Sequence, residues 1–414
     1  MYERICRLLL NNGVRLIYTT NRVIGNTLKK LEKKYPSFHF EVSTNEKIAY
    51  ELALTGSIAT KRTACVLSTE GIYEALDPVM SSAYMGVLGG FLIVCIRETE
   101  EEVTPLGPFS KLPVMVSENE DEFARACFFG YSISEKYEIP VIIQTAIDIA
   151  HQPSAFSLQP LNSKLETRNS KPSSSRFVKN PSRWAATPKF RFQLHKELNS
   201  KIEKIREEFE GYAGNVKIKK GKTGIITDRH SGLEFYDEDT SMLYISTVFP
   251  LPNKLVNAFI EKMDKVYVVD GPYHPIELQI QDRRKVIMEQ MGKAHKRPKP
   301  EEKMYGFTVL RDILGPASSI NMAHGIKKLE PDKKVLAITY EDHFFHSGMP
   351  AFVNTLYNNS SYVLLIMTNT REEEIKRIMK GCGFSNFFHI NAVSEVEKFK
   401  DRKDLTVLFC RGII

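Results

Sequence analysis

Short apolar runs alternate with amphipathic stretches along most of the chain. Apolar runs bounded by polar or turn-forming residues are typical of buried strands, and the stretches between them repeat apolar residues at helical spacing. This alternation indicates α/β layers around mainly parallel sheets, here in three successive blocks. The predicted strands are 14–19, 38–42, 63–68, 91–96 and 140–145 in the first block, 223–227, 242–246 and 265–270 in the second, and 334–339, 362–368 and 405–410 in the third. The predicted helices are 22–34, 46–58 and 120–135, then 192–210, 255–262 and 277–291, then 344–357 and 372–380.

Two segments break the pattern and suggest where the domains divide. Pro, Ser, Asn and Lys dominate residues 150–185, and a Pro- and Lys-rich run follows at 293–303. Such segments lack the apolar periodicity needed to enter a core, so they are typical of linkers. We therefore expect a first domain at 1–150, a linker and charged helix at 151–215, a second domain at 216–292, a basic hinge at 293–304 and a third domain at 305–414.

Composition narrows the class of protein. Over 414 residues, 42% are apolar and 26% are charged, which is ordinary for a folded globular protein. No apolar run approaches the roughly 20 residues of a membrane span, and no cleavage pattern follows the first apolar stretch. We expect a cytoplasmic protein without membrane association. The six cysteines are scattered without a CxxC pair, so no zinc or iron–sulfur site is encoded locally.

The net charge of +7 permits a polyanionic partner without requiring one. Much of the basic excess falls in residues 164–201 and 293–303, where a solvated face is the simpler explanation. No recognised nucleic-acid-binding pattern accompanies it. A nucleic-acid-associated role through these basic linkers therefore stays open as an alternative.

Polar residues follow the strands of the third block, where ligands of open α/β sheets collect. Glu341 and Asp342 follow one strand, and Asn369 follows the next. A carboxylate and an amide oxygen would suit a Mg²⁺ ion that bridges to a diphosphate. From spacing alone, helix capping is the simpler explanation of the same residues, because Asp and Asn commonly satisfy free N–H groups at such strand-to-helix turns. His343 and His346 form an HxxH, a spacing that can place two imidazoles on one face of a helix. It lacks the third ligand of a zinc site, so packing or capping is the simpler interpretation and metal binding the alternative.

The first block offers one further candidate. Asn45-Glu46-Lys47 opens a predicted helix, and a Glu in the first turn is favoured by the helix dipole. A carboxylate that hydrogen-bonds a cofactor ring is the functional alternative. The acidic run 98–102 is interpreted as a solvated loop without chemistry, and His324 as a helix residue near a close backbone contact.

Several motifs together carry a family likeness. Residues 45–49 (NEKIA), 76–90 (LDPVMSSAYMGVLGG) and 344–348 (FFHSG) are the most specific of them. Shorter matches continue at 70–71, 134–142, 247–252, 266–270 and 322–325. The chain resembles the α subunit of indolepyruvate:ferredoxin oxidoreductase, and the likeness touches all three blocks.

The resemblance implies a fold, a cofactor and a set of site residues. It implies three parallel-sheet domains of the thiamine-diphosphate-enzyme type: pyrimidine-like, transketolase C-terminal-like and a shortened diphosphate-like domain. The family uses thiamine diphosphate and Mg²⁺ to decarboxylate aryl 2-oxoacids and passes electrons to ferredoxin. By resemblance, Glu46 falls on the cofactor-activating glutamate, Glu341 and Asn369 on Mg²⁺ ligands, and Glu341, Asp342, Asn369 and Gly348 on the cofactor-binding edge. It also implies a homodimer, or a hetero-oligomer with another oxidoreductase-like subunit.

The departures from the family pattern weaken the case for an intact site. Tyr340-Glu341 stands where the family has Gly-Asp, and the YPGTPS turn is replaced at residues 18–22. The CPGCPHR segment between Pro300 and Ala317, the loop after Asn369 and the ferredoxin-like tail are absent, so this chain is expected to hold no iron–sulfur cluster. The sequence therefore predicts a pseudoenzyme that retains no cofactor and acts as scaffold, regulator or partner subunit. An active 2-oxoacid oxidoreductase subunit, using thiamine diphosphate, Mg²⁺ and a partner's clusters, remains the alternative.

Overall fold

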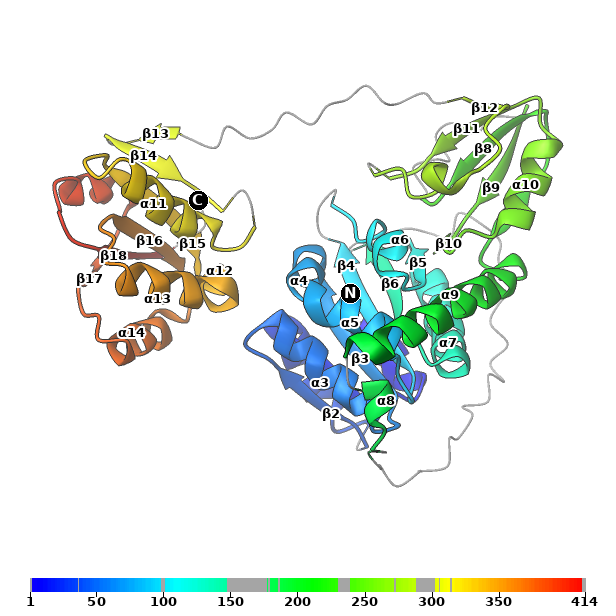
Figure 1. The fold of residues 1–414 in the computed structure, drawn as a ribbon, viewed down its shortest axis with the longest axis horizontal. Helices are drawn as coiled ribbons and strands as arrows, with labels where there is room; N and C mark the ends of the chain where they lie inside the picture. The colour runs from blue at the N-terminus through cyan, green and yellow to red at the C-terminus, as the bar shows by residue number, and fades with distance from the viewer. Residues whose placement is uncertain are drawn as a thin grey trace. The chain divides into compact units, whose positions relative to one another are not determined.

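The computed structural model divides the chain into two compact units, residues 1–293 and 294–414 (Figure 1). It describes residues 2–35, 37–97, 101–146, 177, 179–184, 187–229, 239–271, 273–287, 302–304, 306–312 and 315–411. Most of the predicted linker and of the predicted basic hinge lies outside these residues, so the five-part division remains a prediction.

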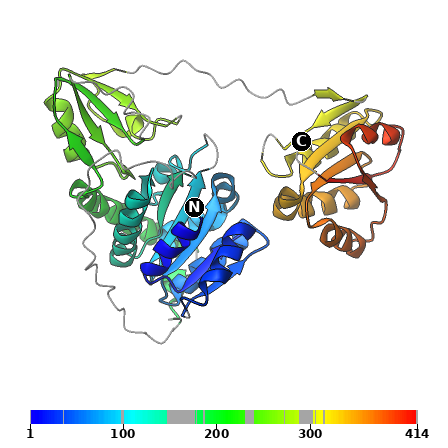
Figure 2. The same cartoon turned by 180° about the vertical axis from the view of Figure 1, so that it is seen from behind.

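The first sheet is built from strands in the order β10-β5-β6-β4-β3-β1-β2, all parallel except β10, which runs antiparallel to β5. Helices lie on both sides of its buried strands, as Figure 2 shows from behind. The strands are β1 (Leu16–Thr19), β2 (His39–Val42), β3 (Thr63–Ser68), β4 (Phe91–Arg97), β5 (Val114–Ser117), β6 (Val141–Ala146) and β10 (Thr247–Phe249). The helices are α1 (Tyr2–Asn11), α2 (Arg22–Leu31), α3 (Glu46–Ile58), α4 (Thr69–Glu74), α5 (Leu76–Met85), α6 (Leu106–Ser110) and α7 (Glu120–Tyr137).

Helix α9 (Pro188–Glu210) belongs to the core of the first sheet. Its buried residues recur at helical spacing, and all five join the same apolar cluster as β3 and β4. These residues are Leu194, Leu198, Ile202, Ile205 and Phe209. The short helix α8 (Pro181–Trp184) precedes it, and the Arg183 guanidinium donates to the carbonyls of Met85 (3.2 Å) and Val87 (3.0 Å). The predicted charged helix is thus a covering layer of the first sheet.

The second sheet follows in the same unit, with the strand order β12-β11-β8-β9-β7. Parallel strands β11, β8 and β9 form its centre, and β7 pairs antiparallel to β9. The elements are β7 (Val216–Ile218), β8 (Thr223–Thr227), β9 (Thr240–Tyr244), α10 (Asn253–Glu261), β11 (Lys265–Val269), the 3₁₀ turn η2 (Glu277–Gln279) and β12 (Val286–Ile287).

The helix predicted at 277–291 is wrong over the residues that the structure describes. A single 3₁₀ turn is followed by a strand, because Val286 and Ile287 pair in parallel with Val266 and Tyr267 of β11. β-branched residues favour such an edge strand, and the pairing overrides the weak helical pattern.

The second unit contains the third sheet, with strand order β13-β14-β15-β16-β18-β17. All described pairs are parallel except β13 with β14. The strands are β13 (Glu302–Met304), β14 (Phe307–Leu310), β15 (Val335–Tyr340), β16 (Val363–Thr368), β17 (Phe387–Ile390) and β18 (Thr406–Arg411). The helices are α11 (Ser318–Leu329), α12 (Glu341–His343), the π-helical turn η3 (Phe344–Gly348), α13 (Met349–Tyr357), α14 (Glu372–Gly381) and the 3₁₀ helix η4 (Val393–Phe399).

The predicted fold class, α/β with three mainly parallel sheets, is confirmed. Within the described parts of the chain, no helix has both the length and the apolar character needed to cross a membrane.

Candidate functional site

The carboxyl edge of the third sheet brings Glu341 and Asn369 together. Strands β15 and β16 are parallel neighbours, with Tyr340 opposite Met367, so the residues after them meet at one edge. The Glu341 carboxylate is buried, and its Oε2 accepts hydrogen bonds from the backbone N–H groups of Asn369 (2.8 Å), Thr370 (3.1 Å) and Arg371 (3.0 Å). The two residues are therefore adjacent, but Glu341 binds backbone donors.

These donors precede helix α14. The first N–H groups of a helix have no partner within it, and a carboxylate there is favoured by the helix dipole. Glu341 supplies that carboxylate from the end of a neighbouring strand. Three more acids, Glu372, Glu373 and Glu374, fill the first turn of α14. The Arg371 guanidinium lies 3.3 Å from the centre of the Phe345 ring and 3.0 Å from Glu374.

Asp342 and Gly348, the other two predicted cofactor-binding residues of this edge, do not share the hydrogen bonds that join Glu341 to Asn369. The side chain of Asp342 is 84% exposed, and its Oδ1 lies 4.0 Å from Arg371 Nη1. Gly348 is a position of close packing, since a Cβ there would lie 3.0 Å from the Phe344 ring and 3.3 Å from the Cβ of Ala317. The structure thus groups Glu341 with the backbone of Asn369, while Asp342 faces solvent. Their assignment to a cofactor or a metal remains a prediction.

The two imidazoles of the HxxH have separate partners. His343 Nδ1 lies 2.8 Å from the Asp312 carboxylate, whereas His346 Nδ1 lies 2.5 Å from the Ser347 hydroxyl. Asp312 also accepts from the Thr339 hydroxyl (2.6 Å) and the Ser319 N–H (3.1 Å).

Asp312 has an altered acidity. Burial raises its pKa, but the hydrogen bonds from His343, Ser319 and Thr339 outweigh burial and leave the pKa below its ordinary value. Asp312 was not predicted as a site residue, because β14, the strand that it follows, was not predicted from the sequence either.

Glu46 lies in the first unit, at the first position of α3. The Asn45 side chain caps this helix by accepting from the Lys47 N–H at 2.8 Å. Glu46 is half-buried and packs against Gly71, where a Cβ would lie 2.9 Å from the Glu46 Cγ. Burial, and in second place the Glu46 charge, raises the pKa of the Cys65 thiol on β3. The local structure fits the helix-dipole explanation and leaves the catalytic assignment a prediction.

A buried cluster of charged side chains, which was not predicted from the sequence, links the first and second sheets. Glu102, expected in a solvated loop, has a side chain only 1% exposed. It pairs with Arg229, which follows β8, and lies 3.5 Å from Arg97 at the end of β4. Arg97 in turn contacts Glu118 at 3.2 Å.

The cluster continues at Asp228, which lies 3.3 Å from Arg229. Burial raises the pKa of Asp228 to about 7 against the pull of Arg229, with further contributions from the negative charges of Glu102 and Asp270. The carboxyl ends of the first and second sheets therefore share a buried, carboxylate-rich region.

The fold is that of a 2-oxoacid oxidoreductase of the thiamine-diphosphate-enzyme type. A solved 2-oxoglutarate:ferredoxin oxidoreductase from Magnetococcus marinus superposes with a TM-score of 0.50 and 14% identity, over 69% of this chain. The chain spans 60% of the length of that protein's chain.

In sequence, the chain is similar to indolepyruvate oxidoreductase subunits. The chain is 25% identical to indolepyruvate oxidoreductase subunit IorA of Pyrococcus abyssi, over 87% of its own length and 72% of that subunit. It is 24% identical to the IorA subunit of Archaeoglobus fulgidus, over 94% of its own length and 79% of that subunit. No protein-family model matches the chain. The resemblance carried by motifs such as NEKIA and FFHSG is confirmed, and the chain is an oxidoreductase-like protein similar to these subunits.

Proposed function

We propose that this chain is a thiamine-diphosphate-fold subunit whose cofactor site has decayed, and that it serves an oxidoreductase assembly as a scaffold, regulator or partner subunit. The observation that carries the proposal is the position of the Glu341 carboxylate. It accepts from the N–H groups of residues 369–371, at the strand-end edge where the resemblance implies a Mg²⁺–diphosphate group.

The residues at this edge do not fit a bound diphosphate. An anion at a helix N-terminus depends on free N–H donors to replace its hydration. The three donors before α14 already share one carboxylate oxygen, and Glu372, Glu373 and Glu374 add negative charge to the next turn. A diphosphate would meet carboxylates at the positions where it needs donors.

Two sequence features support the same conclusion. Tyr340 replaces the small residue of the family pattern, and its ring lies 5.5 Å from the His343 ring at the same edge. The loop that the family inserts after Asn369 is absent, since α14 begins at Glu372. The edge therefore has fewer backbone donors than the family pattern provides.

The alternative function is an active subunit that depends on another chain for iron–sulfur clusters and for the missing loops. Glu46 at the first position of α3 favours it, because its position in the sequence matches the family's cofactor-activating glutamate. The relatives are named as subunits, so a partner chain suits both functions. The assembly would be a homodimer or a hetero-oligomer.

Isothermal titration of the full chain with thiamine diphosphate and Mg²⁺ separates the two functions. We expect no binding heat up to millimolar cofactor. Micromolar binding that is lost in Asn369→Ala would overturn the proposal and support the active alternative. In that case Glu46→Gln should abolish 2-oxoacid-dependent reduction of an electron acceptor without changing the circular dichroism spectrum.

The subunit role needs a separate measurement. The chain, expressed in its own cells from its own locus with a small tag, should copurify in stoichiometric amount with a second chain of the 2-oxoacid oxidoreductase type. Recovery as a monomer from gentle lysis, with no such chain by mass spectrometry and no self-association in light scattering, would contradict a subunit role.

A further inference from the structure

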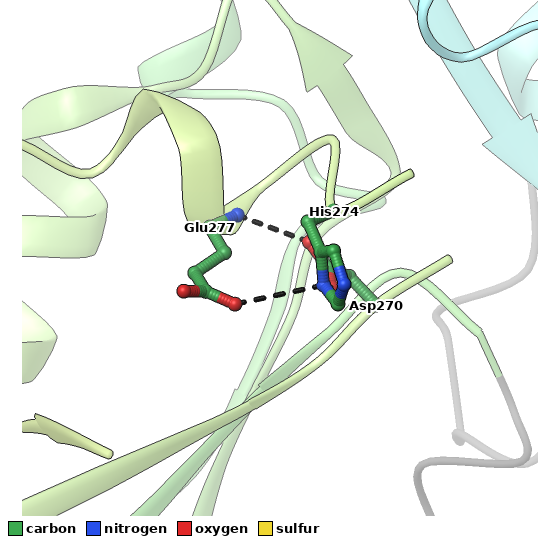
Figure 3. Close-up of side chains that lie close together, drawn as sticks. All are labelled: Asp270, His274 and Glu277. Atoms are coloured by element: carbon green, nitrogen blue, oxygen red, sulfur yellow. Dashed lines mark hydrogen bonds and ion pairs between the residues drawn. The ribbon is translucent and has the colours of Figure 1, made fainter. Parts of the chain in front are cut away.

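The second sheet carries a cluster of side chains that the proposed function does not use. Asp270 follows β11, and the side chains of His274 and Glu277, from the segment after it, lie close to the Asp270 side chain (Figure 3). One donor atom from each residue lies within 4.8 Å of the other two. We propose that Asp270, His274 and Glu277 bind a first-row divalent transition-metal ion such as Zn²⁺ or Mn²⁺.

The distances between donor atoms suit a shared ion. Asp270 Oδ1 lies 3.2 Å from His274 Nδ1, which lies 3.5 Å from Glu277 Oε2. Metal–ligand bonds of about 2.1 Å at octahedral or tetrahedral angles place neighbouring donors roughly 3.0–3.4 Å apart. Two of the three donor separations are therefore close to those of a coordination sphere, and the third, between Asp270 and Glu277, is within 4.8 Å.

The loop holds Asp270 in the orientation that a ligand needs. Its Oδ2 accepts from the N–H groups of Ile276 (2.9 Å) and Glu277 (3.0 Å), which leaves Oδ1 toward the imidazole. Hydrogen bonds of this kind to the second oxygen fix the direction of a ligating carboxylate. The Asp270 side chain is only 1% exposed.

His274 is held in an uncommon backbone conformation. Its φ is 51°, in the left-handed region, and its N–H donates to the Gly271 carbonyl at 2.9 Å. Its side chain is 32% exposed, so the imidazole lies at the border between the buried Asp270 carboxylate and solvent. For Nδ1 to ligate, the imidazole must be neutral with its proton on Nε2.

The surroundings supply an excess of negative charge. Val269 of β11 pairs with Thr227 of β8, so Asp270 and Asp228 follow in register at the ends of neighbouring parallel strands, both with buried side chains. Among the described residues of this region, the carboxylates outnumber the guanidinium groups: Glu102, Glu118, Asp228, Asp270 and Glu277 against Arg97, Arg229 and Arg283, the last of which donates to the Glu277 carbonyl at 3.0 Å.

Glu102 and Arg229 of this charge cluster lie next to the proposed metal site. A Cβ on Gly271 would lie 2.0 Å from Glu102 Oε2 and 2.6 Å from Arg229 Nη2, so these two charged groups pack directly against the backbone next to Asp270. Buried like charges repel strongly, and a dication offsets that repulsion. The imidazole nitrogen in the donor set favours a transition metal over Mg²⁺ or Ca²⁺, which prefer oxygen.

The test is metal titration of the full chain, purified without a histidine tag and stripped with a chelator. We expect one equivalent of Zn²⁺ or Mn²⁺ to bind in calorimetry, and Co²⁺ to give a visible ligand-field absorption band. His274→Ala should weaken Zn²⁺ binding by at least about tenfold and remove the Co²⁺ band. Glu277→Gln, which keeps the side-chain shape, should also weaken binding and keeps the test decisive if His274→Ala folds poorly.

His389→Ala is the matched control. His389 also has Nδ1 3.2 Å from a carboxylate, that of Glu372, but no second acidic ligand is recorded beside it among the described residues. Zn²⁺ affinity should be unchanged in this variant. The proposal is overturned by an absence of Zn²⁺ and Mn²⁺ binding up to about 1 mM, which is very weak for a protein site. Equal loss in His389→Ala and His274→Ala, or Mg²⁺ binding as tight as Zn²⁺ binding, would also overturn it. Each result is independent of whether thiamine diphosphate binds.

Discussion

At the scale of single residues, Glu341 shows how one carboxylate can satisfy a helix terminus from a distant part of the chain. Its carboxylate accepts hydrogen bonds from the N–H groups of residues that lie 28 to 30 positions later in the chain. Its Oε2 takes all three of these bonds, and the residue is only 8% exposed. Removing it leaves three N–H groups in part-buried hydrogen bonds without their charged acceptor, and a hydrogen bond to a charged group contributes more than one between neutral groups.

We therefore expect Glu341→Ala to destabilise the second unit by about 2 kcal/mol, the range of a charged hydrogen-bond acceptor and helix cap. Urea unfolding of the full chain, followed by circular dichroism, measures the change. Asp342→Ala is the control, because its side chain is 84% exposed and should change stability by no more than about 0.5 kcal/mol. Equal effects of the two substitutions would contradict the capping role.

Asp312 gives a prediction about pH. Its folded-state pKa lies below its ordinary value of 3.8, so the ionised carboxylate stabilises the fold above that pH. This contribution is lost as the pH falls through the folded-state pKa. We expect Asp312→Asn to be less stable than the wild type near neutral pH, with the difference shrinking between about pH 5 and pH 2.

Unfolding free energies of both proteins across that range test the prediction. Asp332→Asn, at an exposed position, is the comparison and should track the wild type. A difference between Asp312→Asn and wild type that stays constant down to the lowest pH would show that Asp312 acts only through packing.

For single residues, the sequence predicts which positions meet in space better than it predicts which atoms bond there. The adjacency of Glu341 and Asn369 was predictable, because the ends of neighbouring parallel strands meet. The partner of the Glu341 carboxylate was not, since spacing cannot distinguish a metal from backbone donors. Burial of Glu102 was hidden for a similar reason: its partner Arg229 lies 127 residues further along the chain.

At the scale of elements, helix α9 is the clearest revision of the expected organisation. Its sequence is rich in charge and follows a Pro- and Ser-rich segment, which suggested a connection between domains. Its apolar residues nevertheless recur along one face, and that face lies in the core of the first sheet. The positions of strands were easier to predict than the strands with which they pair. The predicted bounds 63–68 and 223–227 match β3 and β8, but no sequence feature of residues 247–249 indicated that β10 pairs with β5 in the first sheet.

The packing of α9 predicts a strong dependence on Ile205, which has no exposed surface. Ile205→Ala should destabilise the first unit by about 3 kcal/mol, because it removes buried methyl groups and leaves a cavity. The matched control is Lys204→Ala, one residue earlier on the exposed face of the helix. Equal unfolding midpoints for the two variants in urea would show that α9 does not contribute to the core.

At the scale of the whole molecule, the alternation of strands and helices was enough to predict three mainly parallel sheets, because both buried strands and amphipathic helices have a local signature. The division into two compact units was not predictable in the same way. It depends on long-range contacts, such as β10 with β5 and Arg229 with Glu102, which tie the second sheet to the first.

The net charge of +7 is a property of the whole molecule, and it bears on the remaining alternative, a nucleic-acid-associated function. With 57 basic against 50 acidic residues, the electrostatic attraction for a polyanion is small. In fluorescence anisotropy with a labelled RNA or DNA, we expect Kd values no tighter than about 10⁻⁶ M at physiological salt, weakening steeply between about 50 and 200 mM salt. Tight, sequence-selective binding that resists salt cannot come from counterion release by basic linkers alone, and would make a nucleic acid the partner to study first.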